Sequence, residues 1–263
     1  MGMTLGTAPR LTLVTITTMP RHPFRPMVAV AITSIMPEPT MNTAVTEQLT
    51  VAGQAIEHES FAVIDAEVGQ HAYSAEQWVI VRRMIHATAD FEFNGLTAFH
   101  PQAVAAGRAA VLKGATPIVA DVEMITVGLS APRLRHFGLT THQFIADPDV
   151  IERARAEGST RAVQAMRLAW RRGLLDGALI GVGNAPTALL EVIRLVREEG
   201  VRPALIIGMP VGFVSAAESK EQLATLSEVP WILCRGRKGG STLVVAALHG
   251  LLSLAETQTH AAA

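Results

Sequence analysis

The stretch Ala178-Leu-Ile-Gly-Val-Gly183 decides the fold, because it is a short apolar run that ends in glycine just before a helical pattern. The same order of apolar run, glycine-containing loop and helix recurs at Ala204-Leu-Ile-Ile-Gly208 and at Trp231-Ile-Leu-Cys-Arg235. Uninterrupted apolar runs are typical of strands that are buried on both faces of a parallel sheet. We therefore predict an α/β protein with an open, doubly wound, mostly parallel sheet and helices on both faces.

The helices after these strands are marked by their start and stop signals. The pattern predicts helices over 187–199, where Gly200 follows, and over 241–254. Between them, Ser215-Ala-Ala-Glu218 has the spacing of a capping box, in which two side chains satisfy free amides at the start of a helix. Three glycine-rich loops thus fall at the carboxyl ends of strands, where doubly wound sheets bind ligands.

The chain before residue 178 shows the same alternation in a weaker form. A capping box at Ser74-Ala-Glu-Gln77 opens a helix that extends to about Ala87, and a second helix runs from Pro101 until Gly114 stops it. The other predicted elements are a strand over 117–121, a strand near 141–146, a helix from Asp147-Pro148 and a helix from the N-cap Ser159 to Trp170. Residues 51–263 are expected to form a single domain.

Residues 1–50 do not share this pattern, since six prolines between Pro9 and Pro39 exclude any long helix. The most apolar stretch there, over 27–36, is shorter than the roughly 20 residues that cross a bilayer, and it is not followed by the cleavage site of a secretory signal. We interpret residues 1–50 as a disordered extension or as the product of a start codon placed too early, with Met41 as the alternative start.

Composition limits the partners and the compartment. A net charge of -1 gives no general reason to expect nucleic acid or an anionic membrane as a partner. The single cysteine, Cys234, excludes an internal disulfide and a cysteine-based zinc site, and it fits a cytoplasmic protein. Only three of the 22 basic residues are lysines. The others are arginines, whose planar fork matches carboxylates and phosphates.

The glycine-rich loops do not match the nucleotide-binding motifs. Gly181-x-Gly183 begins a dinucleotide fingerprint, but Pro186 occupies the third glycine position. The 236–241 loop is not a P-loop, because its lysine precedes the glycines. These loops could instead offer backbone amides at helix N-termini to an anionic ligand, helped in the last loop by Arg235, Arg237 and Lys238, or they could simply form tight turns.

Three further residues could carry chemistry. His86 lies in the last turn of the helix that starts at Ser74, close to Arg83, and it could exchange a proton near neutral pH or only form a structural hydrogen bond. Arg161 stands in the first turn of a helix, where a cation is disfavoured unless it faces an anion. Ser60 precedes an apolar run where a helix or loop begins, and alone it indicates little. The histidines lack the pairing of a metal site.

Together the motifs resemble one family. They are, in chain order, Ile56-Glu-x-x-Ser60-Phe-Ala-Val-Ile64, Arg83-Met-Ile-His86, Ala106-Gly-Arg-Ala-Ala110, Gly114-Ala-Thr-Pro-Ile118, Gly158-x-Thr-Arg161, Ile180-Gly-Val-Gly-Asn-Ala-Pro-Thr-Ala-Leu189, Gly208-Met-Pro-Val-Gly-Phe-Val214, Ala216-Ala-Glu-Ser-Lys220 and Arg235-Gly-Arg-Lys-Gly-Gly-Ser241. Over roughly 52–254 the chain resembles the precorrin-8X methylmutases of cobalamin biosynthesis.

The resemblance implies an isomerase that moves a methyl group from C11 to C12 of a tetrapyrrole. The product is hydrogenobyrinic acid, or cobyrinic acid if the substrate carries cobalt, and the sequence leaves this choice open. The resemblance also implies a flavodoxin-like fold, no cofactor or metal, and a homodimer with active sites near the subunit interface. It assigns proton transfer to His86 and substrate contacts to Ser60, Arg83 and Arg161, to which we add Gly183 and Asn184 of the glycine loop.

Two features of the sequence make some of these contacts doubtful. Ala131 stands where the family has an arginine, and Glu59 places a carboxylate beside Ser60, where it would repel a carboxylate-rich substrate unless it points away. Two alternatives therefore stay open at this point. The chain could bind a tetrapyrrole without converting it, or it could be an α/β enzyme that binds a nucleotide.

Overall fold

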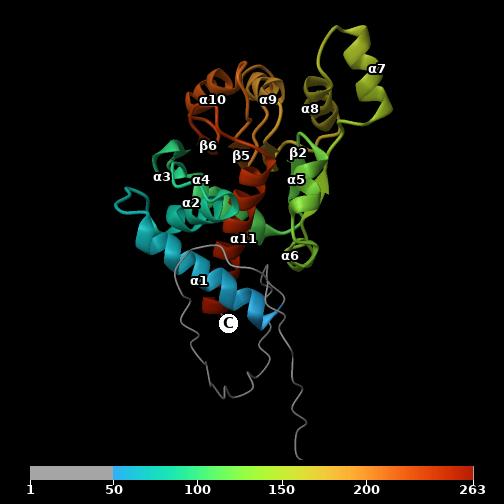
Figure 1. Cartoon of the computed structure of the whole chain (residues 1–263). Coiled ribbons are helices and arrows are strands. Elements are labelled where there is room, and N and C mark those ends of the chain that lie inside the picture. Colours follow the sequence, from blue (N-terminus) through green and yellow to red (C-terminus); the bar gives the residue numbers. More distant parts are fainter. Residues whose placement is uncertain (1–49, 263) are drawn as a thin grey trace, which may run out of the picture. The chain divides into compact units, whose positions relative to one another are not determined.

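The computed structural model describes residues 50–262 and shows a six-stranded sheet with helices packed against it (Figure 1). The interpretation of residues 1–49 lies outside the described residues. The strands are β1 Thr97–Phe99, β2 Pro117–Ala120, β3 Thr140–His142, β4 Leu179–Val182, β5 Leu205–Gly208 and β6 Trp231–Cys234. The helices are α1 Val51–Glu67, α2 Ala75–Thr88, α3 Phe93–Leu96, α4 Ala103–Lys113, α5 Glu123–Gly128, α6 Ala131–His136, α7 Pro148–Ala156, α8 Arg161–Arg171, α9 Pro186–Glu198, α10 Ala216–Ala224 and α11 Ser241–Ala262.

The strand order confirms the predicted fold class. Across the sheet the order is β1-β6-β5-β4-β2-β3, and every neighbouring pair is parallel except β1 with β6. The five parallel strands, numbered in chain order, read 2-1-3-4-5, which is the flavodoxin-like order. The point where the order reverses, and where such sheets bind ligands, lies between the carboxyl ends of β2 and β4.

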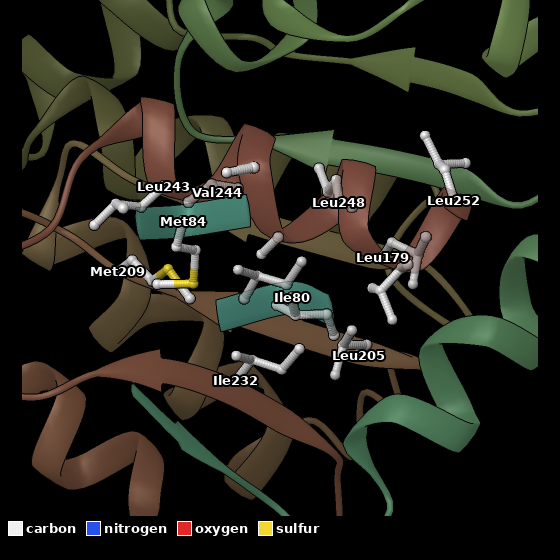
Figure 2. Close-up of a cluster of buried hydrophobic side chains, with 14 of the residues drawn as sticks. Ile80, Met84, Leu179, Leu205, Met209, Ile232, Leu243, Val244, Leu248 and Leu252 are labelled. Carbon is white, nitrogen blue, oxygen red and sulfur yellow. The ribbon is translucent and has the colours of Figure 1, made fainter. Parts of the chain in front are cut away.

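Alternating residues of the central strands fill two cores, one on each face of the sheet. On one face, Leu179 and Ile232 pack with Ile80 and Met84 of α2 and with the apolar side of α11, as Figure 2 shows. On the other face, residues such as Ile180 pack against α8, α9 and α10. All residues of β4, β5 and β6 are buried, which is why their sequences read as continuous apolar runs.

Several predicted element starts and ends are wrong. Ser215 adopts a left-handed backbone with a φ of 59°, and its hydroxyl makes no cap hydrogen bond, so the predicted capping box of α10 is absent. Thr160 rather than Ser159 caps α8, because its hydroxyl accepts the amide hydrogen of Val163. Strand β3 is shorter than predicted, since the Gln143 side chain accepts the amide hydrogen of Ile145 and forms a turn there.

Two helices near the site also differ from their predictions. Ser60 does not lie where a helix or loop begins but inside α1, which Thr50 caps. The last helix, α11, extends beyond the predicted 241–254 to Ala262. The capping box of α2 is confirmed, with Ser74 and Gln77 bonding reciprocally. No helix within residues 50–262 is both long and apolar enough for a membrane crossing.

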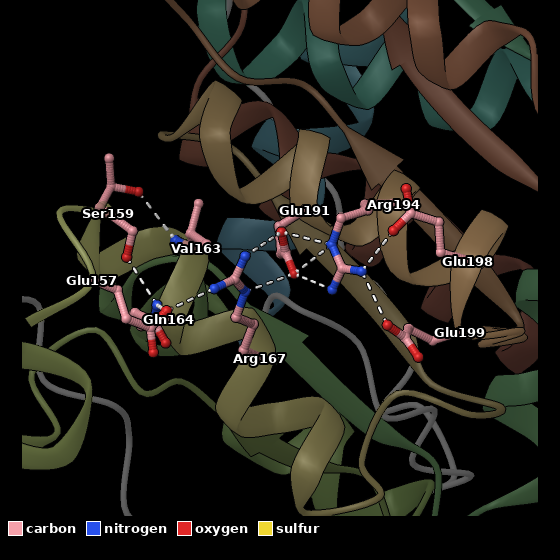
Figure 3. A network of polar contacts seen from close by, with 10 residues as sticks. Glu157, Ser159, Val163, Gln164, Arg167, Glu191, Arg194, Glu198 and Glu199 are labelled. Atoms are coloured by element: carbon pink, nitrogen blue, oxygen red, sulfur yellow. Dashed lines mark hydrogen bonds and ion pairs between the residues drawn. The ribbon is translucent and has the colours of Figure 1, made fainter. Parts of the chain in front are cut away.

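A buried carboxylate joins α8 to α9. Glu191 of α9 accepts hydrogen bonds from Arg167 of α8, at 2.9 Å, and from Arg194, at 2.7 Å (Figure 3). Burial alone would raise the pKa of Glu191, but the hydrogen bonds from Arg194 and Arg167 outweigh it and hold this pKa below its usual value of 4.5. The folded state therefore favours the charged form, and this contribution to stability is lost as the pH falls through the lowered pKa.

We expect Glu191→Gln to lower the free energy of unfolding by about 1–3 kcal/mol at pH 7, since it weakens hydrogen bonds to charged groups. The difference from wild type should shrink as the pH falls below 4.5 and through the lowered pKa, because both proteins then carry a neutral side chain. Urea unfolding at pH 7 and at acidic pH measures this. Glu198→Gln is the control, because Glu198 pairs with Arg194 from an exposed position. Equal losses of stability in the two variants at pH 7 would contradict the stabilising role of the buried Glu191 carboxylate.

Candidate functional site

His86 lies where two hollows of the surface meet, and this makes it the centre of the candidate site. The first, here called the His86 groove, has a volume of about 430 Å³ and lies between α1 and the end of α2. Its lining includes Ile56, Ser60, Val63, Ile85, His86 and Phe91. The groove is thus mostly apolar, with a hydroxyl and an imidazole among its few polar groups.

The local sequence explains why His86 faces outward. The inner face of α2, with Ile80 and Met84, packs on α11 (Figure 2). The side chain of His86, in the last turn of α2, is exposed. The Phe61 ring of α1 meets the imidazole edge to face, with ring centroids 5.2 Å apart. The Ser60 hydroxyl donates to the Ile56 carbonyl at 2.8 Å, so towards a ligand it can act only as an acceptor.

The second hollow, here called the polar cavity, has a volume of about 120 Å³, and His86 also lines it. Its other lining residues are the polar Glu57, Arg83, Thr242 and His249 and the apolar Ala87, Val245 and Ala246. Arg83 donates to Glu57 at 2.8 Å, and each of the two side chains is only 11% exposed. The charge of Arg83 is therefore balanced inside the protein. Arg83 lies beside His86, as the sequence predicted, but it is a buried and paired cation rather than an exposed one.

A buried polar network continues from this cavity into the core. Arg133 of α6 donates twice to Glu256 of α11, at 2.8 and 2.7 Å, and once to the hydroxyl of Ser253, at 2.8 Å. It also lies 3.1 Å from Nδ1 of His249. A guanidinium can only donate, so Nδ1 accepts, and the proton of His249 is on Nε2, which faces the carbonyl of Gly128 at 3.3 Å. The wall of the cavity is thus held in one arrangement.

The switch point between β2 and β4 is occupied by the protein's own carboxylate. Asp121, fully buried after β2, accepts hydrogen bonds from the backbone amides of Gly183, Asn184 and Ala185, at 3.1, 2.8 and 2.8 Å. Burial raises the pKa of Asp121, against the opposing effect of these bonds. Of the two alternatives left open for this loop, the one with free amides is therefore excluded at residues 183–185, because Asp121 accepts their hydrogen bonds. Sequence reasoning missed Asp121, whose only signal was an acidic residue at a strand end.

Gly183 is required for packing. A Cβ at this position would lie 2.6 Å from Cα and 2.7 Å from the backbone nitrogen of Ser241, the first residue of α11. Because α11 also carries Thr242 and His249 of the polar cavity, this close approach links the glycine loop to the wall of the candidate site. The structure thus places Gly183 near the site without exposing it to a ligand.

We expect Gly183→Ala to lower the free energy of unfolding by about 1–3 kcal/mol, because the added methyl group overlaps backbone atoms that cannot move aside cheaply. Urea unfolding measures the loss. Asn184→Ala is the matched control in the same loop, since its side chain is exposed and its backbone bond to Asp121 is kept. A Gly183→Ala protein as stable as this control would show that the contact is relieved by a backbone shift.

Arg161 lies apart from the two hollows. It is exposed in the first turn of α8, and it makes no ion pair with any side chain of residues 50–259. The neighbouring Thr160 hydroxyl lies 3.0 Å from the Thr187 hydroxyl, which joins the start of α8 to the start of α9. The structure therefore groups Ser60, Arg83 and His86, and it leaves Arg161 on the side of the sheet where α9 begins.

No group of three or more His, Cys, Asp or Glu side chains that could hold a metal ion occurs among the residues that the structure describes. Cys234, buried in β6, has its pKa raised to about 11 by burial, so its thiol stays protonated at neutral pH. Among the grouped residues, the exposed imidazole of His86 is a group that can donate and accept a proton.

Comparisons with known proteins agree on one activity. The family model for precorrin-8X methylmutase matches residues 55–254. A cobalt-precorrin-8 methylmutase of Leptospira interrogans is 51% identical over 212 residues, which cover 79% of this chain and 96% of the relative. Its counterpart in Priestia megaterium is 49% identical over 209 residues, or 80% and 91% of the two chains. A solved structure of the precorrin-8X methylmutase from Thermus thermophilus is 51% identical, with a TM-score of 0.72, and the match covers 78% and 98% of the two chains.

Proposed function

Because the chain belongs to the precorrin-8X methylmutase family, we propose that the His86 groove is the place where its methyl transfer occurs. The activity is that of an isomerase that moves a methyl group within a precorrin-8 substrate. In the proposed reaction the methyl group leaves C11 and bonds to C12. The observation that carries the location is the exposed imidazole of His86 between an apolar groove and a polar cavity.

The walls of the groove suit one face of a flat macrocycle. The side chains of Ile56, Val63 and Phe91 are exposed by 65%, 49% and 37%, and they offer apolar surface to a ring. Ser60, as an acceptor, can receive a hydrogen bond from a ring N–H. Glu59 also lines the groove, and its charge would keep the carboxylate side chains of the substrate away from this wall.

In the proposed mechanism His86 gives a proton to the conjugated ring and later takes it back. Protonation makes the carbon framework electron-poor, which favours migration of the methyl group with its bonding electrons from C11 to C12. Substrate and product are isomers, so the proton is returned and nothing else is consumed. General acid–base catalysis of this kind contributes about 10²–10⁴-fold to a rate. The Arg83–Glu57 pair lies behind His86 and fixes the cavity wall against which the imidazole rests.

We further propose that the protein is a homodimer. Pockets that bury drug-sized ligands have volumes of about 300–1,000 Å³. A tetrapyrrole is larger than such ligands, so the His86 groove, at about 430 Å³, is too small to enclose it fully. Ile56 and Val63 of α1, both in the groove lining, are 65% and 49% exposed, so α1 presents apolar surface that the described residues leave uncovered. Contiguous apolar surface of this kind marks interfaces. A second copy covering α1 would bury it and enclose the ring.

Light scattering tests the dimer. Ile56→Glu places a charge in the exposed face of α1 and should shift the mass from two chains towards one, whereas Met124→Glu on α5 should not. A monomeric wild type would contradict this part of the proposal.

We place the enzyme in the cytoplasm, where the lone cysteine would stay reduced.

Turnover by the purified full chain tests the function, with no cofactor added. Incubation with precorrin-8X should change the absorption spectrum as conjugation lengthens, while the mass of the pigment stays the same. A parallel incubation with cobalt-precorrin-8 tells which form is converted faster. Tight binding of both pigments without any spectral conversion would instead support a binding protein that does not catalyse.

A further inference from the structure

We propose that Phe213 and Arg237 form a clasp that holds the outer part of the macrocycle, beyond the His86 groove. This inference rests on the proposed function and adds a binding site to it. Phe213 follows β5 and Arg237 follows β6, so both stand at the carboxyl edge of the sheet. The Arg237 guanidinium lies over the Phe213 ring, 5.5 Å from its centroid.

The exposure of Phe213 and of its neighbour Val214 indicates a contact surface. Phe213 is 85% exposed and Val214 is 80% exposed, and no other large apolar side chain of the described residues is as accessible. Large apolar side chains that face water singly need no special role, but two consecutive ones beside an unpaired cation indicate a contact surface. Neither Arg237 nor the nearby Arg235 has an ion-pair partner among residues 50–259.

The base of the clasp is fixed, although its tip is exposed. The amide of Gly212 donates to the carbonyl of Arg237 at 3.2 Å, and the amide of Gly240 donates to the carbonyl of Met209 at 2.8 Å. A Cβ at Gly239 would overlap the carbonyl oxygens of Met209 and Pro210, so the two loops lie in direct contact. Both side chains of the clasp are therefore presented from a preformed base, which reduces the entropy cost of binding.

A buried lysine holds the same loop from below. Lys220 of α10 is fully buried, and its ammonium group donates to the carbonyl of Lys238 at 2.7 Å. This bond fixes the backbone next to Arg237. Buried polar groups need hydrogen-bond partners, and this loop supplies the partner of Lys220. The loop conformation and the burial of Lys220 therefore depend on each other.

An ion pair connects the clasp to the His86 groove. The Lys238 ammonium group lies 2.5 Å from Asp90 and 2.9 Å from Glu92, in the turn that follows α2. Ala89 and Phe91, on either side of Asp90, line the groove. The two carboxylates neutralise Lys238, whereas the exposed Arg235 and Arg237 on the same loop have no such partner among residues 50–259.

The chemistry of the clasp matches the part of the substrate that extends past the groove. An aromatic ring stacks on the face of a conjugated macrocycle, and a guanidinium binds a carboxylate with two parallel hydrogen bonds. A flat ring edged with carboxylates presents both features at its rim. We therefore expect the clasp to act on binding, with little effect on the methyl transfer itself.

Steady-state kinetics of the full chain with precorrin-8X, together with titration of hydrogenobyrinic acid, test the clasp. Phe213→Ala should raise KM and the Kd of the product about tenfold, the size expected for one lost stacking contact, with kcat within twofold of wild type. Phe213→Trp should keep wild-type affinity. Arg237→Met should also weaken binding, and its affinity should depend less on salt than that of wild type.

Two substitutions of similar exposure are the controls, Val127→Ala on α5 and Arg155→Met on α7, and neither should change KM. An active wild type with unchanged KM in Phe213→Ala and Arg237→Met would overturn the clasp alone. Loss of dimer in Phe213→Ala, seen by light scattering, would assign Phe213 to the subunit interface and also overturn it. A wild type that neither binds nor converts the pigments would overturn the proposed function.

Discussion

Replacement of His86 by alanine is expected to lower kcat by about 10²–10⁴-fold, because it removes the group that gives and takes back the proton. The imidazole is exposed, and its ring contact is with Phe61 of α1. The variant should therefore fold normally, with a free energy of unfolding within about 0.5 kcal/mol of wild type. Conversion of precorrin-8X followed by absorbance, together with urea unfolding, separates the two effects.

The matched control for His86→Ala is His136→Ala. His136 is also an exposed histidine in the last turn of a helix, α6, and it also meets a phenylalanine ring, Phe137, edge to face. Since it lines neither hollow at the site, His136→Ala should keep wild-type turnover. If His86→Ala retained turnover within twofold of this control, His86 would have no part in the proton transfer.

The second large effect concerns the buried cation behind the site. Arg133→Met is expected to lower the free energy of unfolding by about 3–5 kcal/mol, because it leaves the carboxylate of Glu256 buried without its partner. The Arg133 side chain is only 1% exposed, so water cannot replace the lost contacts at low cost. Urea unfolding at pH 7 measures the loss from the midpoint and the slope.

The double variant Arg133→Met with Glu256→Leu tests the cause. It removes the unpaired charge, and it should recover at least half of the lost stability, since apolar replacement of a whole buried pair is often neutral. Arg153→Met provides the surface comparison, because Arg153 pairs with Asp149 at an exposed i,i+4 position that contributes about 0.3–0.5 kcal/mol. Equal losses for Arg133→Met and Arg153→Met would show that the buried network does not stabilise the fold.

The sheet was predictable because burial on both faces leaves a signal in each central strand. β6 has four consecutive apolar residues, and β5 has three before Gly208. Such runs, followed by glycine-containing loops and helices, are typical of buried parallel strands. β1 gave no such signal, since it has three residues, lies at the edge and pairs only with β6, in the antiparallel sense. Its pairing depends on tertiary contacts that no local pattern contains.

The site was predictable only in part, for a related reason. The capping box at Ser74 and the apolar spacing of α2 place His86 on the outward side, and this follows from the sequence alone. The carboxylate of Asp121 satisfies amides that come 62 residues later, because β2 and β4 become neighbours only through the strand order. Likewise the burial of Arg83 depends on Glu57, which a separate helix brings to it.

The measurement that tests the central claim most directly is a crystal structure of the full chain with hydrogenobyrinic acid bound. We predict that the macrocycle lies in the His86 groove, with an imidazole nitrogen of His86 facing its edge and the Ser60 hydroxyl in contact. A macrocycle bound instead over the switch point, against Asp121 and the Gly183 loop, with His86 left in solvent, would contradict the account.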